Sequence, residues 1–513
     1  MRPADRCTCL SAFAEPRPGL SARSAYLRVG LPLALLSLAV YLGASRLGGY
    51  LGFPLDDAWI HQTYARNLAT RGEFAFVPGQ PSAGSTSPLW SGLLAAGYGL
   101  GLEPRAWAYA LGALSLSAAA GLAYRLVRHL WPERPGAALF AAGAVALEWH
   151  LAWASVSGME TGLFAALALA VFALPVEQAA WLGGLAGVSV VVRPDGLTLL
   201  PFLLARIWLA GPARGRRLLA AGLAFALIFA LYLAFNVAVG GAIWPNTFFA
   251  KQAEYAAVRQ APLLARLFWL CDSGTGRCEP GIAVLPLLGA QFLLAPGLAA
   301  VGGAALRARR WEPLLPLAWA AAFVAAYVIR LPATYQYGRY VMPVIPVLVA
   351  VGVPGLAGLL RLNAAGFWPR VLSRTWAAAL AALWLAFWGQ GAAVYQRDVR
   401  VIETEMVAAA RWVRANTPAE AVIAAHDIGA LGYFGERRLL DLAGLVSPEV
   451  IPFIRDEARL AAWLTESGAD YLMTFPGWYP GLTQPRADRR VFQTGAPYAP
   501  AAGGENMAVY AWP

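Results

Sequence analysis

Long apolar runs dominate the chain from about residue 27 to about residue 390, where they stop. An α-helix needs about 20 apolar residues to cross the roughly 30 Å hydrocarbon core of a membrane, and runs near this length recur through this part of the chain. The pattern predicts a mainly α, polytopic membrane domain over residues 27–391. A second domain of ordinary size is expected over residues 392–513.

Arginine-rich segments separate the apolar runs and predict their orientation. Three of them lie in the C-terminal half and contain Arg214, Arg216 and Arg217; Arg307, Arg309 and Arg310; and Arg361, Arg370 and Arg374. Basic loops are enriched on the cytoplasmic side. Membrane spans of alternating direction are therefore expected near residues 218–239, 281–304, 312–330, 339–360 and 375–391. The domain that follows is then extracytoplasmic.

The N-terminal part extends this topology. Residues 1–26 are expected to be a cytoplasmic tail without a cleavable signal peptide, and their arginines are Arg2, Arg6, Arg17 and Arg23. Residues 46–87 then form the first extracellular loop. The next apolar stretch, residues 88–102, is glycine-rich and only about 22 Å long as a helix. We expect it to dip into the membrane without crossing, which leaves about 11 full spans.

The pattern changes after residue 391. Helix-like and strand-like stretches alternate, with helices expected at 401–416 and 457–467 and strands at 421–426 and 470–475. Such alternation is typical of an α/β domain. The sequence therefore predicts a C-terminal extracytoplasmic α/β domain.

Composition supports a membrane protein and narrows the partners. The chain is 59% hydrophobic and 13% charged, whereas soluble proteins carry about 25% charged residues. Its formal charge of +11 resides in loops, as expected for cytoplasmic loops, and does not imply a nucleic-acid partner. Lys251 is the sole lysine among the 40 basic residues.

Two adjacent carboxylates, Asp56 and Asp57, follow the first apolar run. If a helix begins at Asp57, then His61 and Tyr64 share its face. Paired carboxylates at a membrane surface can provide one general base and one orienting or metal-binding acid. Alternatively one of them is a helix N-cap, a role that needs a single Asp.

Other polar residues are expected at the outer ends of spans, where charge is costly and often functional. Glu160 is a candidate, with a helix cap as the alternative. Arg193 and Asp195 are candidates too, and a local ion pair is their alternative. A phosphate leaving group needs cations, which Lys251, Arg193 and Arg339 can supply. Interfacial snorkelling is the alternative for Lys251 and Arg339.

The four cysteines form two close pairs. Cys271 and Cys278 are expected in one outer loop, where oxidation permits a disulfide. Cys7 and Cys9 are only a weak indication of a metal site.

Several short motifs occur in a specific order along the chain. They are DDAWIHQTYARNLATRGEFAF (56–76), GSTSPLW (84–90), SGMETGLF (157–164), RPDGL (193–197), WPNTFFAK (244–251), YGRYVMPVIP (337–346) and AHDIGALGYFGERRLLDLAGLVSPE (425–449). In this order they resemble GT-C superfamily glycosyltransferases. The nearest group is that of the mycobacterial terminal arabinofuranosyltransferases and their uncharacterised bacterial relatives.

The resemblance implies a multi-pass enzyme of the cytoplasmic (inner) membrane with its active site outside. It implies a polyprenyl-phosphate-linked sugar donor, with a pentofuranose among the candidate sugars, and a cell-envelope glycan, lipid or protein as acceptor. Asp56 and Asp57 correspond to the essential acids of the family. They are also the candidate ligands of a divalent cation. The substrate-binding candidates are His61, Tyr64, Glu160, Arg193, Asp195, Asn246, Lys251 and Arg339.

Two other function classes stay open on the sequence. A transporter or flippase of lipid-linked glycans would also use charges at membrane depth, but it would more naturally show paired halves with similar broken helices. A non-catalytic envelope-binding protein is the third class. A nucleotide site is not expected, because the sequence has no P-loop and no GxGxxG motif after a strand.

Overall fold

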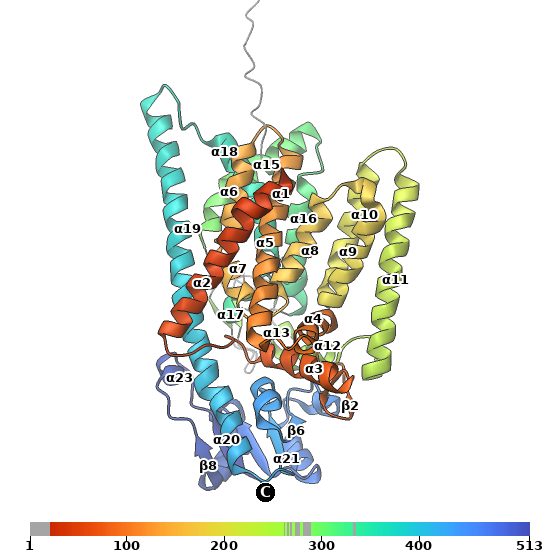
Figure 1. The fold of residues 1–513 in the computed structure, drawn as a ribbon, viewed down its shortest axis with the longest axis vertical. Coiled ribbons are helices and arrows are strands. Elements are labelled where there is room, and N and C mark those ends of the chain that lie inside the picture. Colours follow the sequence, from red (N-terminus) through yellow and green to blue (C-terminus); the bar gives the residue numbers. More distant parts are fainter. Residues whose placement is uncertain are drawn as a thin grey trace, which may run out of the picture.

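The structure is a computed structural model that describes residues 21–260, 262–263, 266, 269–271, 278–280, 289–331 and 335–512. Long helices form a bundle, and a smaller domain that contains a β-sheet lies at one end of it (Figure 1). The first 20 residues, including Cys7 and Cys9, lie outside the described residues.

The bundle and its connecting loops contain the elements from α1 to α19. The helices are α1 (Ala22–Ala25), α2 (Leu31–Leu47), α3 (Asp57–Arg71), α4 (Pro88–Gly99), α5 (Pro104–Leu130), α6 (Pro135–Ala146), α7 (Trp149–Ser155), α8 (Thr161–Ala173), α9 (Ala179–Val192), α10 (Leu199–Leu209), α11 (Arg214–Gly240), α12 (Asn246–Glu254), α13 (Ala256–Gln260), α15 (Ala295–Ala308), α16 (Leu314–Arg330), α17 (Tyr335–Gly338), α18 (Ile345–Leu359) and α19 (Phe367–Ile402). The strands are β1 (Ala75–Val77), β2 (Gln80–Pro81), β3 (Trp269–Cys271) and β4 (Cys278–Pro280).

Six helices of the described chain are long and apolar enough to cross a membrane, or up to eight if each of two bent helix pairs counts as one span. This confirms a mostly helical chain with several candidate spans. The bent pairs are α6 with α7, and α8 with the helix that includes α9. The expected span at 281–304 lies partly outside the described residues, and the count of about 11 spans stays a prediction.

The two ends of the bundle differ in character. The connections from α5 to α6, from α10 to α11, from α15 to α16 and from α18 to α19 all lie at the end far from the C-terminal domain (Figure 1). These are the arginine-rich segments of the sequence. Helices α3 and α4 lie at the opposite end, beside the C-terminal domain. Helix α4 has 12 residues, in keeping with a segment that does not cross.

The C-terminal domain contains a five-stranded mixed sheet in the order β6-β5-β7-β9-β8. Its elements are α20 (Ala408–Asn416), β5 (Val422–Ala425), β6 (Arg438–Asp441), α21 (Glu457–Glu466), β7 (Tyr471–Thr474), α22 (Pro480–Thr483), β8 (Arg490–Gln493), α23 (Tyr498–Ala501) and β9 (Ala508–Ala511). Strand β5 pairs in parallel with both β6 and β7, while β9 is antiparallel to β7 and β8. The three parallel strands therefore end at the same edge of the sheet.

Helix α19 joins the two parts of the chain. It runs without a break from Phe367 to Ile402 and continues through a π-helical turn into α20, so the predicted domain boundary at 391/392 falls inside a helix. Glu405 in this turn is buried and accepts hydrogen bonds from the Thr494 hydroxyl and from the Met507 N–H. These bonds fix the sheet to the end of the long helix.

Candidate active site

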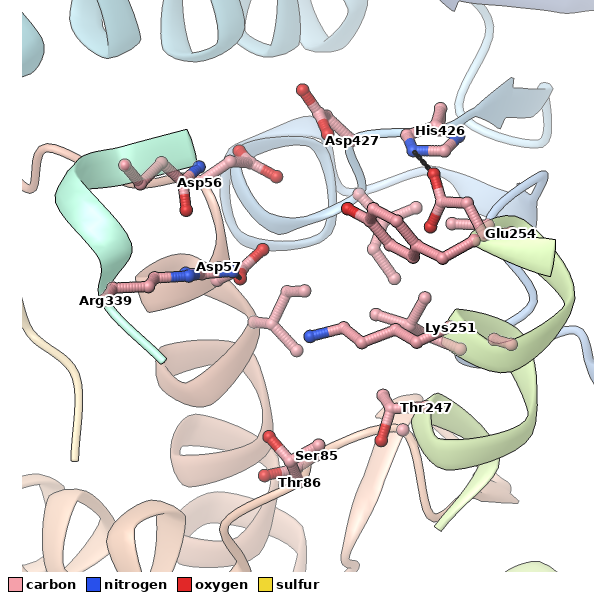
Figure 2. Close-up of a pocket in the computed structure, with 18 of the residues that line it drawn as sticks. Asp56, Asp57, Ser85, Thr86, Thr247, Lys251, Glu254, Arg339, His426 and Asp427 are labelled. Carbon is pink, nitrogen blue, oxygen red and sulfur yellow. Dashed lines mark hydrogen bonds and ion pairs between the residues drawn. The ribbon is translucent and has the colours of Figure 1, made fainter. Parts of the chain in front are cut away.

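A cavity of about 580 Å³ lies between the bundle and the C-terminal domain. Its walls come from α3, from the loop after β2, from α12, from the segment before α18 and from the loops that follow β5, β6 and β7. Figure 2 shows side chains from these elements converging on it. Ligands of open α/β sheets commonly bind outside the carboxyl ends of parallel strands, and this cavity has that position.

Asp56 attaches the segment between α2 and α3 to the C-terminal domain. Its Oδ2 accepts a hydrogen bond from the Gly429 N–H at 2.6 Å, and its Oδ1 accepts one from the Ala430 N–H at 2.8 Å. A Cβ at position 429 would lie 2.0 Å from the Asp56 carbonyl oxygen, so glycine permits this close approach. Burial raises the pKa of Asp56 to about 7, although the two N–H donors oppose the shift.

Asp57 faces the cavity and pairs with a cation. Its Oδ2 lies 2.5 Å from Nη2 of Arg339, and its side chain is 40% exposed. Burial alone would raise the pKa of Asp57, but the charges of Arg339 and Lys251 outweigh it and lower the pKa to about 2. Neither Asp56 nor Asp57 caps α3 through its side chain, so the N-cap interpretation is not what the structure shows.

Two cations meet beside Asp57. The Lys251 ammonium donates a hydrogen bond to the Tyr340 hydroxyl at 2.7 Å, and Nη2 of Arg339 donates to the same oxygen at 3.1 Å. Arg339 is buried, and its Nε and Nη1 have no hydrogen-bond partner among the described residues. A single carboxylate thus faces two cations with unused donors, an arrangement suited to an anion such as a phosphate.

The backbone before Arg339 is unusual. Gln336 and Tyr337 have φ of 55° and 59°, in the left-handed region that non-glycine residues rarely adopt. Such conformations cluster at ligand sites, where the surrounding structure maintains them. Here they direct the chain so that Arg339 reaches Asp57.

The opposite part of the cavity has different chemistry. His426 shares a 2.7 Å hydrogen bond with the Tyr479 hydroxyl, and its Nε2 lies 3.8 Å from Glu254. Nη2 of Arg455 lies 3.5 Å from the same Glu254 oxygen. Burial lowers the pKa of His426, against the charges of Glu254 and Asp57, which favour the protonated imidazole. Asp427 and Trp478 also line this part.

Three of the expected site residues besides the two acids line the cavity, namely His61, Lys251 and Arg339. His61 is buried and has Ser91 and Ser85 at 3.1 and 3.2 Å from its Nδ1. Glu160, 3.5 Å from Nε2 of His61, lies behind it and is buried. Glu160 therefore contacts the site through His61, not directly.

Four other expected site residues lie outside the cavity wall. Tyr64 is buried and binds the loop after β2, accepting from the Gly84 N–H and sharing a 2.7 Å hydrogen bond with Ser82. The Asn246 amide donates to the Leu445 carbonyl and so docks α12 onto the C-terminal domain.

Arg193 and Asp195 form the local ion pair that was the alternative to a direct role. Nη2 of Arg193 lies 2.9 Å from Asp195 Oδ2, and it also donates to the Tyr327 hydroxyl and to the Tyr340 carbonyl. These contacts support the backbone of Tyr340, whose hydroxyl accepts from Lys251. The Arg193–Asp195 pair therefore contacts Tyr340 from behind, while Lys251 and Arg339 bind the Tyr340 hydroxyl.

The sequence interpretation missed the residues supplied by the C-terminal domain and by the end of α12. These are Glu254, His426, Asp427, Arg455, Trp478 and Tyr479. A signal was available for some of them. His426 and Asp427 directly follow the expected strand at 421–426, and Glu254 is three residues from Lys251, on the same face of a helix.

Metal binding receives no geometric support within the part of the chain that the structure describes. No three His, Cys, Asp or Glu side chains there are grouped as they would be around a metal ion. Asp56 and Asp57, the residues considered for a cation, are engaged by backbone N–H groups and by Arg339.

Comparison with known proteins gives one sequence-family match and several structural likenesses. A family described as a domain of unknown function (DUF8728) matches residues 392–510. No curated protein sequence matches the chain.

Archaeal oligosaccharyltransferase AglB from Archaeoglobus fulgidus, in complex with an inhibitory peptide and a dolichol-phosphate, is 13% identical with a TM-score of 0.62, over 87% of this chain and 69% of that one. ArnT from Cupriavidus metallidurans bound to undecaprenyl phosphate is 17% identical with a TM-score of 0.59, over 95% and 98%. Mycobacterial arabinofuranosyltransferase AftD is 15% identical with a TM-score of 0.49, over 96% of this chain and 42% of that one. These neighbours are GT-C glycosyltransferases, and the chain described here has the GT-C fold.

Proposed function

We propose that the chain is a membrane glycosyltransferase that transfers a sugar from a polyprenyl-phosphate donor to an acceptor of the cell envelope. The main support for this proposal is that Arg339 and Lys251 converge beside Asp57 in the cavity between the bundle and the C-terminal domain. The structural likenesses support it, because ArnT is bound to undecaprenyl phosphate and AglB to a dolichol-phosphate.

The donor phosphate binds the two cations. The bond between the sugar C1 and the phosphate oxygen breaks, and its electron pair leaves with the phosphate, whose growing charge Arg339 and Lys251 stabilise. The acceptor hydroxyl oxygen forms the new bond to C1. Asp57 takes the proton of that hydroxyl.

The acidity of Asp57 bears on this role. With a pKa of about 2 in the free protein, its carboxylate is a weak base, whereas an efficient general base has a pKa near the operating pH. A bound phosphate competes for Arg339 and weakens the ion pair. The pKa of Asp57 then rises, so donor binding itself activates the base.

The location and topology are part of the proposal. The cytoplasmic (inner) membrane, an outer-facing cavity and about 11 spans follow from placing the arginine-rich connections inside. The far position of these connections relative to the C-terminal domain (Figure 1) supports this orientation. The domain boundaries at about residues 26 and 391 belong to the same proposal, with the second boundary lying within α19.

Donor binding is tested by native mass spectrometry of the purified protein with undecaprenyl phosphate. Arg339→Gln and Lys251→Met are each expected to weaken binding about tenfold to a hundredfold, as for loss of one charge-assisted hydrogen bond. Lys251→Arg should retain binding. Arg330→Gln is the matched control, because Arg330 is exposed at the end of α16. Equal binding by all variants would show that Lys251 and Arg339 do not bind the donor phosphate.

Turnover is tested with a panel of undecaprenyl-phosphate pentoses and hexoses. Release of undecaprenyl phosphate with sugar transfer is expected for at least one donor. Movement of an intact lipid-linked sugar across vesicles, without any bond cleavage, would instead identify the transporter or flippase.

A further inference from the structure

The cavity has a second half that the donor phosphate does not explain. We call it the Trp478 subsite and define it by Glu254, His426, Asp427, Trp478 and Tyr479. Figure 2 shows His426 and Glu254 on the side of the cavity away from Arg339, with Asp427 between Asp56 and His426. All but Glu254 come from the loops that follow β5 and β7.

Trp478 presents an aromatic surface to the cavity. It lies in the 3-10 turn Pro476–Trp478, directly after β7, and is 48% exposed. Phe475 packs against its ring with a centroid distance of 5.0 Å, and His426 lies edge-to-face at 5.2 Å and 84°. Two neighbours thus fix the indole while leaving much of it uncovered. The apolar C–H face of a sugar ring stacks well on such a surface.

Asp427 supplies a free hydrogen-bond acceptor. Its carboxylate lines the cavity and makes no hydrogen bond or ion pair with any residue that the structure describes. Asp56, Asp57 and Glu254 surround it with like charge, and burial together with these charges raises the pKa of Asp427. A carboxyl group without a protein partner in a cavity is suited to a ligand hydroxyl.

Glu254 gives a second carboxylate on the same side. Arg455 and His426 hold it at 3.5 and 3.8 Å, which fixes its position without covering it. Arg455, the cation next to this subsite, already pairs with Glu254. The subsite therefore offers an anionic ligand acidic side chains and no uncommitted cation among its defining residues.

We infer that the Trp478 subsite binds the acceptor and that the acceptor is a neutral carbohydrate, with a sugar ring on Trp478 and its hydroxyls donating to Asp427 and Glu254. The inference rests on the proposed glycosyltransferase function and narrows its acceptor to a glycan. The walls of the cavity combine apolar and aromatic side chains with polar ones that can fix the orientation of a ligand. Since both halves belong to one cavity, a hydroxyl of this sugar reaches Asp57.

Saturation-transfer NMR on the full-length protein in nanodiscs tests the inference. The probes are methyl α-arabinofuranoside, methyl α-mannopyranoside and the charged methyl β-glucuronide. Wild-type protein is expected to bind at least one of the neutral glycosides and to bind the glucuronide more weakly. Trp478→Ala and Asp427→Asn should each weaken binding of the neutral glycoside about tenfold.

The control is Trp181→Ala, which removes a 73% exposed indole from α9 in the bundle and should bind like wild type. Retained binding of undecaprenyl phosphate shows that each variant is folded. Unchanged glycoside binding in both subsite variants, or preferential binding of the glucuronide, would overturn the inference. If wild-type protein binds the neutral glycoside but does not bind undecaprenyl phosphate, the donor proposal is refuted. The inference about the Trp478 subsite is then unaffected.

Discussion

Asp57 and Arg339 form an ion pair of 2.5 Å across 282 residues of sequence. The aspartate begins α3, and the arginine precedes α18. Their contact places an acid and a cation from distant motifs at one point of the cavity. Asp57 thus has a different partner from its neighbour Asp56, whose carboxylate accepts hydrogen bonds from the N–H groups of Gly429 and Ala430.

The first prediction concerns the base. Asp57→Asn should lower turnover about 100-fold to 10,000-fold, the usual contribution of a general base, while expression and membrane insertion stay unchanged. The measurement is release of undecaprenyl phosphate from the active donor. Activity within about threefold of wild type would remove Asp57 from the mechanism, and Asp427 would become the next carboxylate to test.

The second prediction separates Asp56 from catalysis. Asp56→Ala leaves the buried N–H groups of Gly429 and Ala430 without their acceptor, at a cost of roughly 1–3 kcal/mol for each. The contact between the C-terminal domain and the bundle should loosen, and limited proteolysis between the two should speed up. Asp57→Ala is the matched control and should be cleaved like wild type. Equal cleavage of both variants would show that Asp56 does not anchor the domain.

The third prediction is a pH dependence of stability. The pKa of Asp56 is raised to about 7 in the folded protein, so its protonated form favours folding, and this contribution is lost as the pH rises through about 7. The lowered pKa of Asp57, about 2, has the opposite sign, because its contribution to stability is fully present above about pH 4 and is lost as the pH falls through about 2. Between pH 5 and about 8 the melting temperature of wild type should fall relative to that of Asp56→Asn. Parallel pH profiles for the two proteins would contradict the assignment.

The fourth prediction concerns topology. In a variant without native cysteines, Glu466→Cys on the C-terminal domain should react with an impermeant maleimide in intact cells. Asn363→Cys, in the connection between α18 and α19, should react only after permeabilisation. Both positions are exposed, so access to the side chain is not limited by the fold. The reverse pattern would invert the orientation.

The fifth prediction is the disulfide between Cys271 and Cys278. Strands β3 and β4 pair antiparallel with these two residues opposite each other, which brings their backbones close. A bridge here closes a short loop and would contribute about 2–3 kcal/mol by chain entropy. Mass spectrometry of the alkylated native protein should find no free thiol at either position. Two alkylated cysteines would exclude the bridge.

The sequence by itself determined the helical membrane part and several residues of the cavity. Helix formation and membrane crossing depend on local hydrophobic runs, which are visible in the chain. Asp56 and Asp57 were predicted as adjacent carboxylates that follow the first apolar run, and Lys251 and Arg339 as cations suited to a phosphate leaving group. Their grouping in one cavity could not be derived, since it depends on contacts between segments far apart in sequence.

The tertiary structure alone decided which polar residues touch the cavity. Glu160, Arg193 and Asp195 carry the same sequence signal as Arg339, yet they lie behind His61 and Tyr340, because the packing of the helices sets their depth. The role of Asp56 depends on the approach of Gly429 from a domain more than 370 residues later. His426, Asp427 and Trp478 enter the site only because three parallel strands end at the edge of the sheet that faces the membrane part. A local sequence pattern can predict a strand. Which part of the molecule the end of that strand faces depends on the contact between the two domains.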